Sequence, residues 1–262
     1  VTEPLVTPLG VEVFSFTPDE AQAPNSEIPK LPPHTPPRLA HRFLPGRPWS
    51  DRESLPGREE ELARLGELVL ARRPVVVLGQ RRAGKTSLLR HLGRRLANER
   101  DVYYFALEGH RIRNKDDLAL ALSPEIVKDK EDVARATLVD PKISKRVYLI
   151  DELAHLSESD QTVFGWLRQL WHVSGGVVLA GTPWDWWRVH QHAARVVPGS
   201  SFGNDLTPEE LGPLTYPNAI QFLVANRGED SYLDEEAALR IIERCGTWPY
   251  YLNVMGEAVL RA

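Results

Sequence analysis

The feature that most constrains this chain is the run Gly-Gln-Arg-Arg-Ala-Gly-Lys-Thr at positions 79–86. A glycine, four residues and then Gly-Lys-Thr is the pattern of a loop whose backbone N–H groups wrap a phosphate. Residues 74–78 before it are apolar and largely β-branched, as in a buried strand, and an amphipathic helix is predicted over residues 85–98. The positive end of that helix would point at the phosphate. The sequence therefore predicts a nucleotide site between a strand and a helix.

Residues of this loop have distinct predicted roles. Lys85 supplies an ammonium group for the β- and γ-phosphate oxygens, and the Thr86 hydroxyl is expected to ligate Mg²⁺. Two interpretations stay open for the loop arginines, which either contact a partner or are solvated beside an anionic ligand. The residues predicted to contact the nucleotide here are Gly79, Gln80, Arg81, Arg82, Ala83, Gly84, Lys85, Thr86 and Ser87.

A second motif completes the predicted site. Residues 147–150 are apolar and are followed by Asp151 and Glu152. This pattern predicts a central strand that presents two carboxylates at its C-terminal end, where open α/β sheets bind ligands. Asp151 is predicted to hold Mg²⁺, because hard cations prefer oxygen ligands. Glu152 is predicted to orient or deprotonate the attacking water, which favours hydrolysis over phosphoryl transfer to another acceptor.

Strands and helices alternate along the middle of the chain. Strands are predicted at residues 74–78, 102–107, 147–150 and 177–180. Helices are predicted around residues 62–69, 85–98, 116–122, 132–138 and 161–171. This alternation predicts an α/β fold, with a parallel sheet covered by helices on both faces.

The strand pattern stops after Asp205. Residues 206–214 are predicted to be a connecting segment, and helices are predicted at residues 217–226, 234–245 and 249–260. We therefore expect an α/β core at residues 55–205 and a small all-helical lid at residues 206–262. Residues 1–54 are expected to be a proline-rich arm or linker.

The run Leu-Pro-Pro-His-Thr-Pro-Pro at 31–37 supports the arm, because it suits neither a regular helix nor a central strand. An extended linker is one interpretation, and an extended peptide that docks on a partner is the other. The chain begins with Val1 rather than Met, so we interpret it as a fragment or a processed form of a longer polypeptide.

Composition narrows the expected partners and compartment. The formal net charge of -4 argues against a broad nucleic-acid surface, which needs an excess of Lys and Arg. No apolar run is long enough to span a bilayer, so no membrane partner is expected. Cys245 is the single cysteine, which excludes an internal disulfide and favours a reducing, cytoplasmic location.

Two features follow the strand at 177–180. Thr182 either places its hydroxyl near the γ-phosphate, as a sensor with a catalytic role beside Lys85 and Glu152, or belongs to a simple turn. The run Trp-Asp-Trp-Trp at 184–187 is either buried under the lid or exposed as an aromatic contact for a partner.

Short segments resemble those of a known family. Pro-Gly-Arg-Glu at 56–59 looks like the entry element ahead of the phosphate loop in STAND signalling ATPases and origin-recognition AAA+ proteins. Leu-Ala-Gly-Thr at 179–182 resembles their sensor strand. Cys-Gly-Thr-Trp-Pro at 245–249 is similar to their Gly-x-Pro element, with one extra residue before the proline. The chain thus resembles a STAND-clade or archaeal-type AAA+-like P-loop ATPase.

This resemblance implies ATP and Mg²⁺ as cofactors, with an adenine pocket between the entry element and the lid. Pro249 and the backbone near Arg58 would face the base. It also implies a slowly hydrolysing regulatory switch in a multidomain signalling or defence protein, which self-associates with nucleotide and controls an effector. Origin-recognition relatives carry an arginine before the Phe-Gly of the next strand, and the corresponding residues 198–203 here contain none. That departure suits a slow switch, although Arg188 or Arg195 could substitute.

Two other functions stay open. One is an AAA+ DNA-associated ATPase, acting as a loader or transposition regulator, in which case nucleic acid would be a partner. The other is a nucleotide-binding scaffold that does not hydrolyse ATP.

Overall fold

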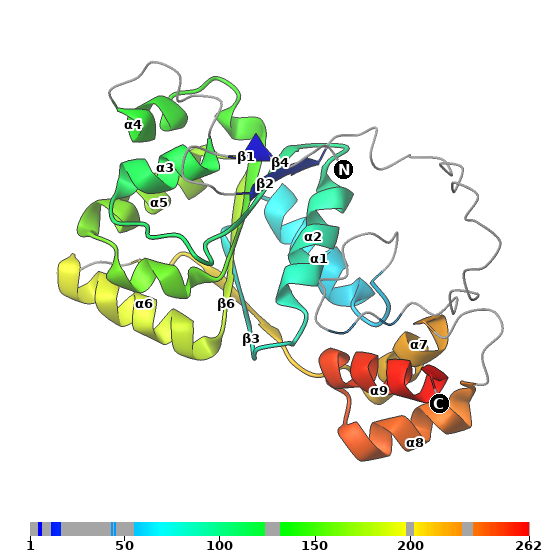
Figure 1. Ribbon diagram of the computed structural model, residues 1–262. Coiled ribbons are helices and arrows are strands. Elements are labelled where there is room, and N and C mark those ends of the chain that lie inside the picture. The colour runs from blue at the N-terminus through cyan, green and yellow to red at the C-terminus, as the bar shows by residue number, and fades with distance from the viewer. Residues whose placement is uncertain are drawn as a thin grey trace, which may run out of the picture.

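The computed structural model describes residues 5–6, 12–16, 43, 45, 55–123, 132–197, 202–226 and 233–261. Figure 1 shows a central sheet with helices on both faces and a separate group of three helices beside it. The predicted α/β class and the helical lid are both present. No helix in these ranges combines the length and apolar character that crossing a bilayer requires.

A seven-stranded sheet forms the centre of the molecule, in the order β1-β2-β4-β5-β6-β3-β7. The five strands from β4 to β7 in that order pair in parallel, which confirms the predicted parallel sheet. Strand β6 lies between β3 and β5. The phosphate loop, which follows β3, and the Asp151–Glu152 pair, at the end of β5, therefore belong to strands that are not neighbours. The strand bounds are Leu5–Val6 (β1), Glu12–Phe16 (β2), Val75–Gly79 (β3), Asp101–Ala106 (β4), Arg146–Asp151 (β5), Gly176–Gly181 (β6) and Thr207–Leu211 (β7).

Helices cover both faces of this sheet, and the last three form the lid. The α/β part contains α1 (Glu59–Leu70), α2 (Lys85–Leu96), α3 (Lys115–Leu122), α4 (Val133–Leu138), α5 (Gln161–Val173) and α6 (Pro183–Val196). Two short 3-10 helices flank β5, namely η3 (Ile143–Lys145) and η4 (Leu153–Glu158). The lid contains α7 (Tyr216–Asn226), α8 (Glu235–Cys245) and α9 (Pro249–Arg261).

Successive side chains of a strand point to opposite faces of the sheet, so the hydrophobic core is divided into two layers, one on each face. In β5, Tyr148 and Ile150 pack into one hydrophobic cluster with side chains of α3, α4, α5 and α6. Val147 and Leu149 face the other way and pack with side chains of α1 and α2. All four side chains are fully buried, because a parallel strand with helices on both faces has no solvent-facing side.

Strand β7 corrects one prediction. Residues 206–214 were expected to be a connecting segment, but residues 207–211 pair in parallel with β3 along its whole length. The strand lies at the sheet edge, where Pro208 and Glu210 are exposed and only Leu211 is buried. Proline and charged side chains are tolerated at an edge, so Thr-Pro-Glu-Glu-Leu lacks the apolar pattern of a central strand.

The first 54 residues contain structure that the sequence analysis did not predict. Strand β2 pairs antiparallel with β4, with Val13 opposite Phe105, and β1 pairs antiparallel with β2. Phe43 is fully buried in the hydrophobic cluster of the lid. The proline-rich run at 31–37 lies outside the described residues.

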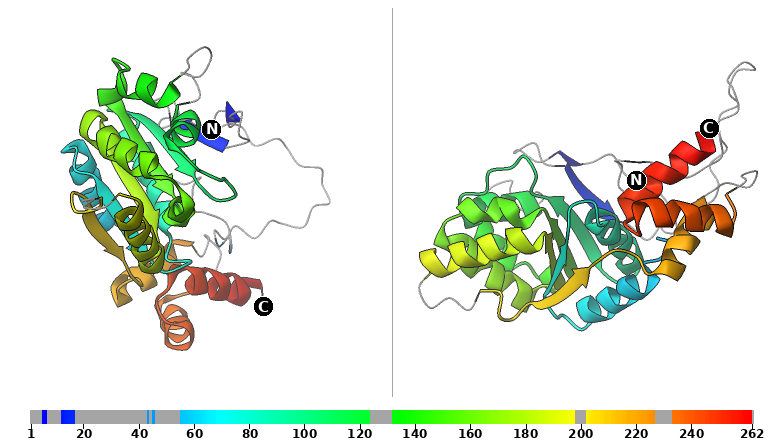
Figure 2. Two further views of the ribbon diagram at one scale, coloured as in Figure 1. Left: turned by 90° about the vertical axis from the view of Figure 1, so that its left-hand side faces the viewer. Right: turned by 90° about the horizontal axis from the view of Figure 1, so that it is seen from below.

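The lid has a hydrophobic core of its own, built from α7, α8 and α9 and completed by Phe43. Figure 2 shows these three helices as a group separate from the sheet and its covering helices. Cys245 at the end of α8 is half-buried and packs against this core, and its burial raises the pKa of its thiol. Cys245 is therefore a packed helical residue.

Candidate active site

The loop between β3 and α2 has the geometry of a phosphate-binding turn. A Cβ atom on Gly79 would lie 2.7 Å from the carbonyl oxygen of Leu211 in β7, so only glycine fits there. Arg82 and Gly84 both have positive φ angles, of 67° and 95°, which curl the backbone back on itself. Helix α2 then begins at Lys85, as the sequence predicts.

Lys85 lies at the centre of this turn. Its Nζ donates hydrogen bonds to the carbonyl oxygens of Gly79 at 3.0 Å and Gln80 at 3.2 Å. Only 7% of the residue is exposed. Burial lowers the pKa of its ammonium group, while the carboxylates of Asp151 and Glu152 oppose that effect. The ammonium is thus oriented toward the space that the loop encloses.

The two predicted metal ligands lie side by side, although they are far apart in the sequence. The Thr86 hydroxyl donates to Oδ2 of Asp151 at 2.6 Å, and the backbone N–H of Glu152 donates to Oδ1 at 2.9 Å. The Tyr104 hydroxyl also donates to Oδ2, at 3.0 Å. A hydroxyl and a carboxylate in contact beside a phosphate loop are hard oxygen donors of the kind that Mg²⁺ prefers, so these residues fit the ion.

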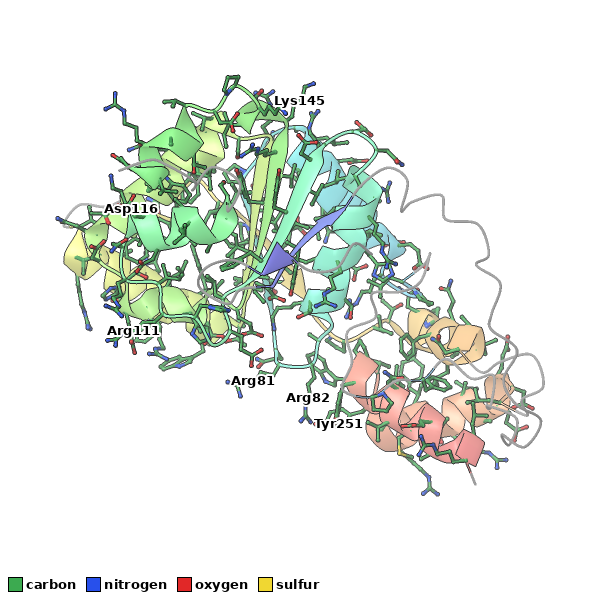
Figure 3. All side chains as sticks on the ribbon, turned by 45° about the horizontal axis from the view of Figure 1, so that its top comes forward. Arg81, Arg82, Arg111, Asp116, Lys145 and Tyr251 are labelled. Carbon is green, nitrogen blue, oxygen red and sulfur yellow. The ribbon has the colours of Figure 1, made fainter. Side chains whose placement is uncertain are left out.

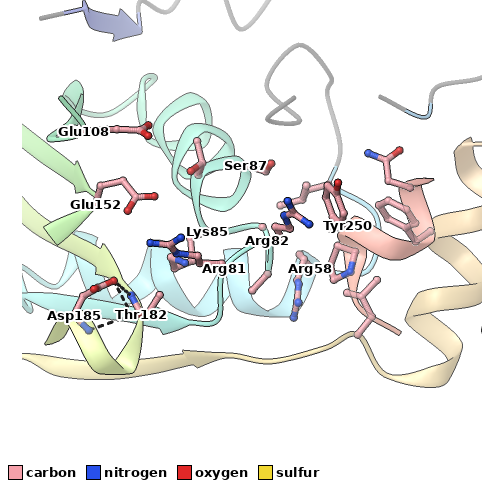
Figure 4. A pocket seen from close by; sticks show the side chains of 18 of the residues that line it. Arg58, Arg81, Arg82, Lys85, Ser87, Glu108, Glu152, Thr182, Asp185 and Tyr250 are labelled. Atoms are coloured by element: carbon pink, nitrogen blue, oxygen red, sulfur yellow. Dashed lines mark hydrogen bonds between the residues drawn. The ribbon is translucent and has the colours of Figure 1, made fainter. Parts of the chain in front are cut away.

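Glu152 occupies an unusual backbone conformation at the end of β5. Its φ and ψ angles of 59° and 51° are in the left-handed region, which a non-glycine residue rarely adopts. Burial raises the pKa of its carboxyl group, and the negative charge of Asp151 raises it further. Figure 4 shows Glu152 and Glu108 on one side of Lys85, with Arg82 and Tyr250 on the other.

A single cavity of about 720 Å³ joins these groups to the lid. It is lined by residues of the phosphate loop, the end of β5, the start of α6, the entry element before α1 and the lid. Eleven of the predicted site residues line it, namely Arg58, Arg81, Arg82, Ala83, Gly84, Lys85, Thr86, Ser87, Glu152, Thr182 and Pro249. Three do not line it, namely Gly79, Gln80 and Asp151, although each bonds to a residue that does.

Five apolar residues from the entry element and the lid region also line the cavity. They are Leu55, Pro56, Leu214, Phe222 and Pro249. This is the position that the resemblance implies for an adenine base. The placement of Pro249 is consistent with that interpretation, and its contact with a base stays a prediction.

Arg58 connects the entry element to the lid. Its Nη1 pairs with Glu61 at 2.6 Å, and its Nη2 donates to the carbonyl oxygen of Gly212, ahead of the lid. The Asn218 side chain in α7 donates to the carbonyl of Gly57 at 3.2 Å. The side chain of Arg58, which is 6% exposed, therefore ties the α/β core to the lid segment.

Thr182 has a structural partner that the sequence analysis did not identify. Its hydroxyl donates to Oδ2 of Asp185 at 2.6 Å and accepts from the Asp185 N–H at 3.1 Å. The second of these bonds, together with a bond of 3.1 Å from the Thr182 backbone N–H to Oδ2 of Asp185, forms a capping box at the start of α6. The hydroxyl is thus committed to the helix end, which corresponds to the turn alternative, and the sensor role of Thr182 stays a prediction.

Tyr250 brings the lid into contact with the phosphate loop. The guanidinium carbon of Arg82 lies 4.1 Å from the centroid of the Tyr250 ring, at the start of α9. This is a cation–π geometry. Figure 3 shows Arg82 beside the lid helix that carries Tyr251. Among the residues that the sequence analysis missed, Tyr250 had a local signal, because it follows Pro249 directly.

The tryptophan run is partly packed against the α/β core and partly exposed. Trp186 is half-buried and packs near Phe202, with ring centroids 6.1 Å apart. Trp184 and Trp187 are 63% and 51% exposed and stack on each other at 4.8 Å. None of the three belongs to the hydrophobic cluster of the lid, so the structure does not favour the alternative in which the run is buried under the lid.

Comparisons with known proteins agree with this fold and site. An AAA domain family model matches residues 71–182, a range that contains the phosphate loop, Asp151, Glu152 and Thr182. A comparison with curated protein sequences gave no significant match.

Solved structures with the same fold include three P-loop ATPases. The Walker-type ATPase of Pyrococcus abyssi is 18% identical, with a TM-score of 0.61, and the match covers 84% of this chain and 71% of that one. Orc1 of Aeropyrum pernix, solved in complex with DNA, is 17% identical, with a TM-score of 0.54 and coverage of 80% and 62%. The ADP complex of S. cerevisiae Hsp104 is 16% identical, with a TM-score of 0.54 and coverage of 80% and 39%.

At these identities the likeness establishes the fold alone. The chain also spans less than two thirds of the length of Orc1 and of Hsp104. The family match and the shared fold together support an AAA+-like P-loop ATPase domain around the phosphate loop.

Proposed function

We propose that this chain binds ATP with Mg²⁺ in the cavity and hydrolyses it by attack of water on the γ-phosphate. The observation that carries the proposal is the contact between Thr86 and Asp151, which joins the two motifs beside Lys85 and Glu152. A cavity of about 720 Å³ lies within the usual range for a small-molecule site.

In this proposal, the loop and the N-terminus of α2 bind the phosphates. Backbone N–H groups of the loop and the N-terminus of the helix favour an anion in the turn. Lys85, held by the carbonyls of Gly79 and Gln80, can donate to the β- and γ-phosphate oxygens. Thr86 and Asp151 would hold the ion, which when bound would neutralise negative charge on the phosphates.

Glu152 acts as the base in this proposal. Its carboxylate accepts a proton from water as the water oxygen bonds to the γ-phosphorus and the bond to the bridging oxygen breaks. Burial raises the pKa of this carboxyl toward the working pH, where a general base is most effective.

We further propose that ATP occupancy switches the module between states, as in STAND-like regulatory ATPases, and promotes self-association that controls an effector. The cavity has walls from both the core and the lid, including Arg58 and Pro249. A nucleotide that contacts both parts would therefore favour one of their arrangements over others. The signalling or defence role rests on the resemblance described above.

Light scattering with and without ATP and Mg²⁺ tests this proposal, on the original chain and on Glu152→Gln. We expect the variant to bind ATP, to hydrolyse it about 10²–10⁴-fold more slowly, and to keep its assembled form longer. Lys85→Ala is the matched control, which should lose phosphate binding and remain unassembled. A chain that binds and hydrolyses ATP but stays monomeric would contradict the assembly proposal and leave the ATPase proposal standing.

A DNA-associated ATPase is the second candidate, motivated by the shared fold with Orc1, which was solved with DNA. Fluorescence anisotropy with labelled duplex DNA would test it, over a range of salt concentrations. ATP-dependent binding that weakens steeply with salt would favour this candidate, because phosphate contacts release counterions. Absence of binding at low salt would remove it.

A further inference from the structure

Tyr104 stands out because it reaches the predicted metal site from a strand that carries no recognised motif. It lies in β4, where its Cα is paired with that of Leu149 in β5. Its side chain is 2% exposed, and its hydroxyl donates to Oδ2 of Asp151 at 3.0 Å. The ring fills core space, but the hydroxyl faces a carboxylate that is itself 1% exposed.

The Asp151 carboxylate receives hydrogen bonds from three directions. Thr86 in α2 and Tyr104 in β4 both donate to Oδ2, and the Glu152 N–H donates to Oδ1. A buried carboxylate needs such donors, because its charge is costly without them. If Thr86 turns its oxygen toward a bound cation, Tyr104 and the Glu152 N–H remain to fix the plane of the carboxylate.

Arg90 in turn holds Tyr104. Its guanidinium carbon lies 5.1 Å from the centroid of the tyrosine ring, within cation–π distance. Arg90 belongs to α2, the helix that carries Thr86. The orientation of Tyr104 is therefore coupled to the helix that presents the other predicted ligand.

We infer that Tyr104 is a positioning residue for the magnesium site, which holds the Asp151 carboxylate in the orientation that receives Mg²⁺. This inference rests on the proposed function. It assigns Tyr104 no contact with the nucleotide. Residues that orient a metal ligand through a hydrogen bond typically change metal affinity about 10–100-fold when they are replaced.

Tyr148 provides a matched control. It is a fully buried tyrosine in the neighbouring strand β5, and it belongs to the hydrophobic cluster on the other face of the sheet. Its hydroxyl lies 3.5 Å from the Ser123 hydroxyl and has no contact with Asp151 among the described hydrogen bonds. Tyr148→Phe removes the same oxygen atom from the same sheet without touching the site.

The experiment measures binding rather than turnover. A fluorescent ATP analogue is titrated against the original chain, Tyr104→Phe and Tyr148→Phe, first with EDTA and then over a series of Mg²⁺ concentrations. We expect Tyr104→Phe to need about 10–100-fold more Mg²⁺ for the same gain in affinity, with unchanged affinity in EDTA. Tyr148→Phe should follow the original chain in both conditions.

Other outcomes separate this inference from the proposed function. An unchanged Mg²⁺ requirement in Tyr104→Phe would overturn the positioning role while leaving the nucleotide site intact. An equal loss of affinity in EDTA would also overturn it, since that result indicates a general disturbance of the loop. If the original chain binds no analogue in either condition, the proposed function itself fails.

Discussion

At the scale of one residue, the burial of Glu152 determines the pH below which hydrolysis is expected to fall. Its raised pKa means that protonation begins at a higher pH than for an ordinary glutamate. A base must be ionised, so hydrolysis should be constant above that pKa and fall as the pH falls through it. Turnover at saturating ATP and Mg²⁺, measured over the acid range, checks this expectation.

The control for this pH dependence is Glu152→Gln, whose residual turnover should lack that acid limb. A parallel binding titration at each pH separates protonation of the enzyme from weaker binding of the nucleotide. Activity that persists down to the pH at which an ordinary glutamate titrates would contradict the assignment.

Thr182 allows a test that separates a cap from a sensor. Because its hydroxyl bonds to Asp185 at the start of α6, Thr182→Ala should lower the free energy of unfolding by about 1 kcal/mol. Thr182→Ser keeps the oxygen and should be nearly neutral. Chemical denaturation measures both. A large loss of hydrolysis by Thr182→Ala with unchanged stability would instead support the sensor role.

At the scale of elements, the contact between the phosphate loop and α9 is the most direct link from core to lid. Tyr250→Ala removes the ring that lies 4.1 Å from Arg82, whereas Tyr250→Phe keeps it. We expect amide hydrogen exchange at the start of α9 to be faster in Tyr250→Ala than in Tyr250→Phe. The lost cation–π contact, which contributes about 0.5–2 kcal/mol, sets the size of the difference in rate. Equal exchange in both variants would show that the ring contributes no stabilisation.

Elements with a strong local pattern were predictable, and elements defined by their neighbours were not. Residues 85–96 form a helix because an apolar face and the glycine turn before it are both visible in the sequence. Strand β7 was missed because its hydrogen bonds with β3 stabilise a charged, proline-containing edge. Strand β2 was missed for another reason: Val13, Phe14 and Phe16 favour a strand, but the segment was assigned to the proline-rich arm as a whole.

The candidate site divides in a similar way. Lys85, Thr86, Asp151 and Glu152 were predictable because their residue types stand at fixed spacing next to apolar strands. Tyr104 was not, since a tyrosine in a strand gives no sign of which carboxylate its hydroxyl will meet. Such contacts depend on the sheet order, and single-sequence patterns do not specify that order.

At the scale of the whole molecule, Phe43 is an integral part of the lid. It is fully buried and packs near Phe222, with ring centroids 6.4 Å apart. Phe222 also lines the nucleotide cavity. Phe43→Ala should destabilise the lid by about 3–5 kcal/mol, because it leaves a cavity in a small core. Hydrogen exchange in α7 and α9 measures this loss.

The space in the lid core that holds the Phe43 ring, here called its socket, can also be tested at Gly256 in α9, which lies against that ring. A Cβ atom there would lie 2.5 Å from Cζ of Phe43, so Gly256→Ala should displace the ring and destabilise the lid. Gly165→Ala is the matched control, as a helical glycine with nothing near its added Cβ. Normal lid exchange in Gly256→Ala would show that the socket adapts without cost.

The contact between Phe43 and Gly256 has a consequence for biosynthesis. Phe43 leaves the ribosome long before any lid helix has been made, and the α/β core emerges between the two. Domains generally fold in the order of synthesis, so the core can form while the phenylalanine still lacks its socket. Contacts between distant residues also form slowly, because a long loop must close first. Completion of the lid is therefore expected to follow formation of the core, and a nascent chain halted before Gly256 would expose an aromatic side chain to chaperones.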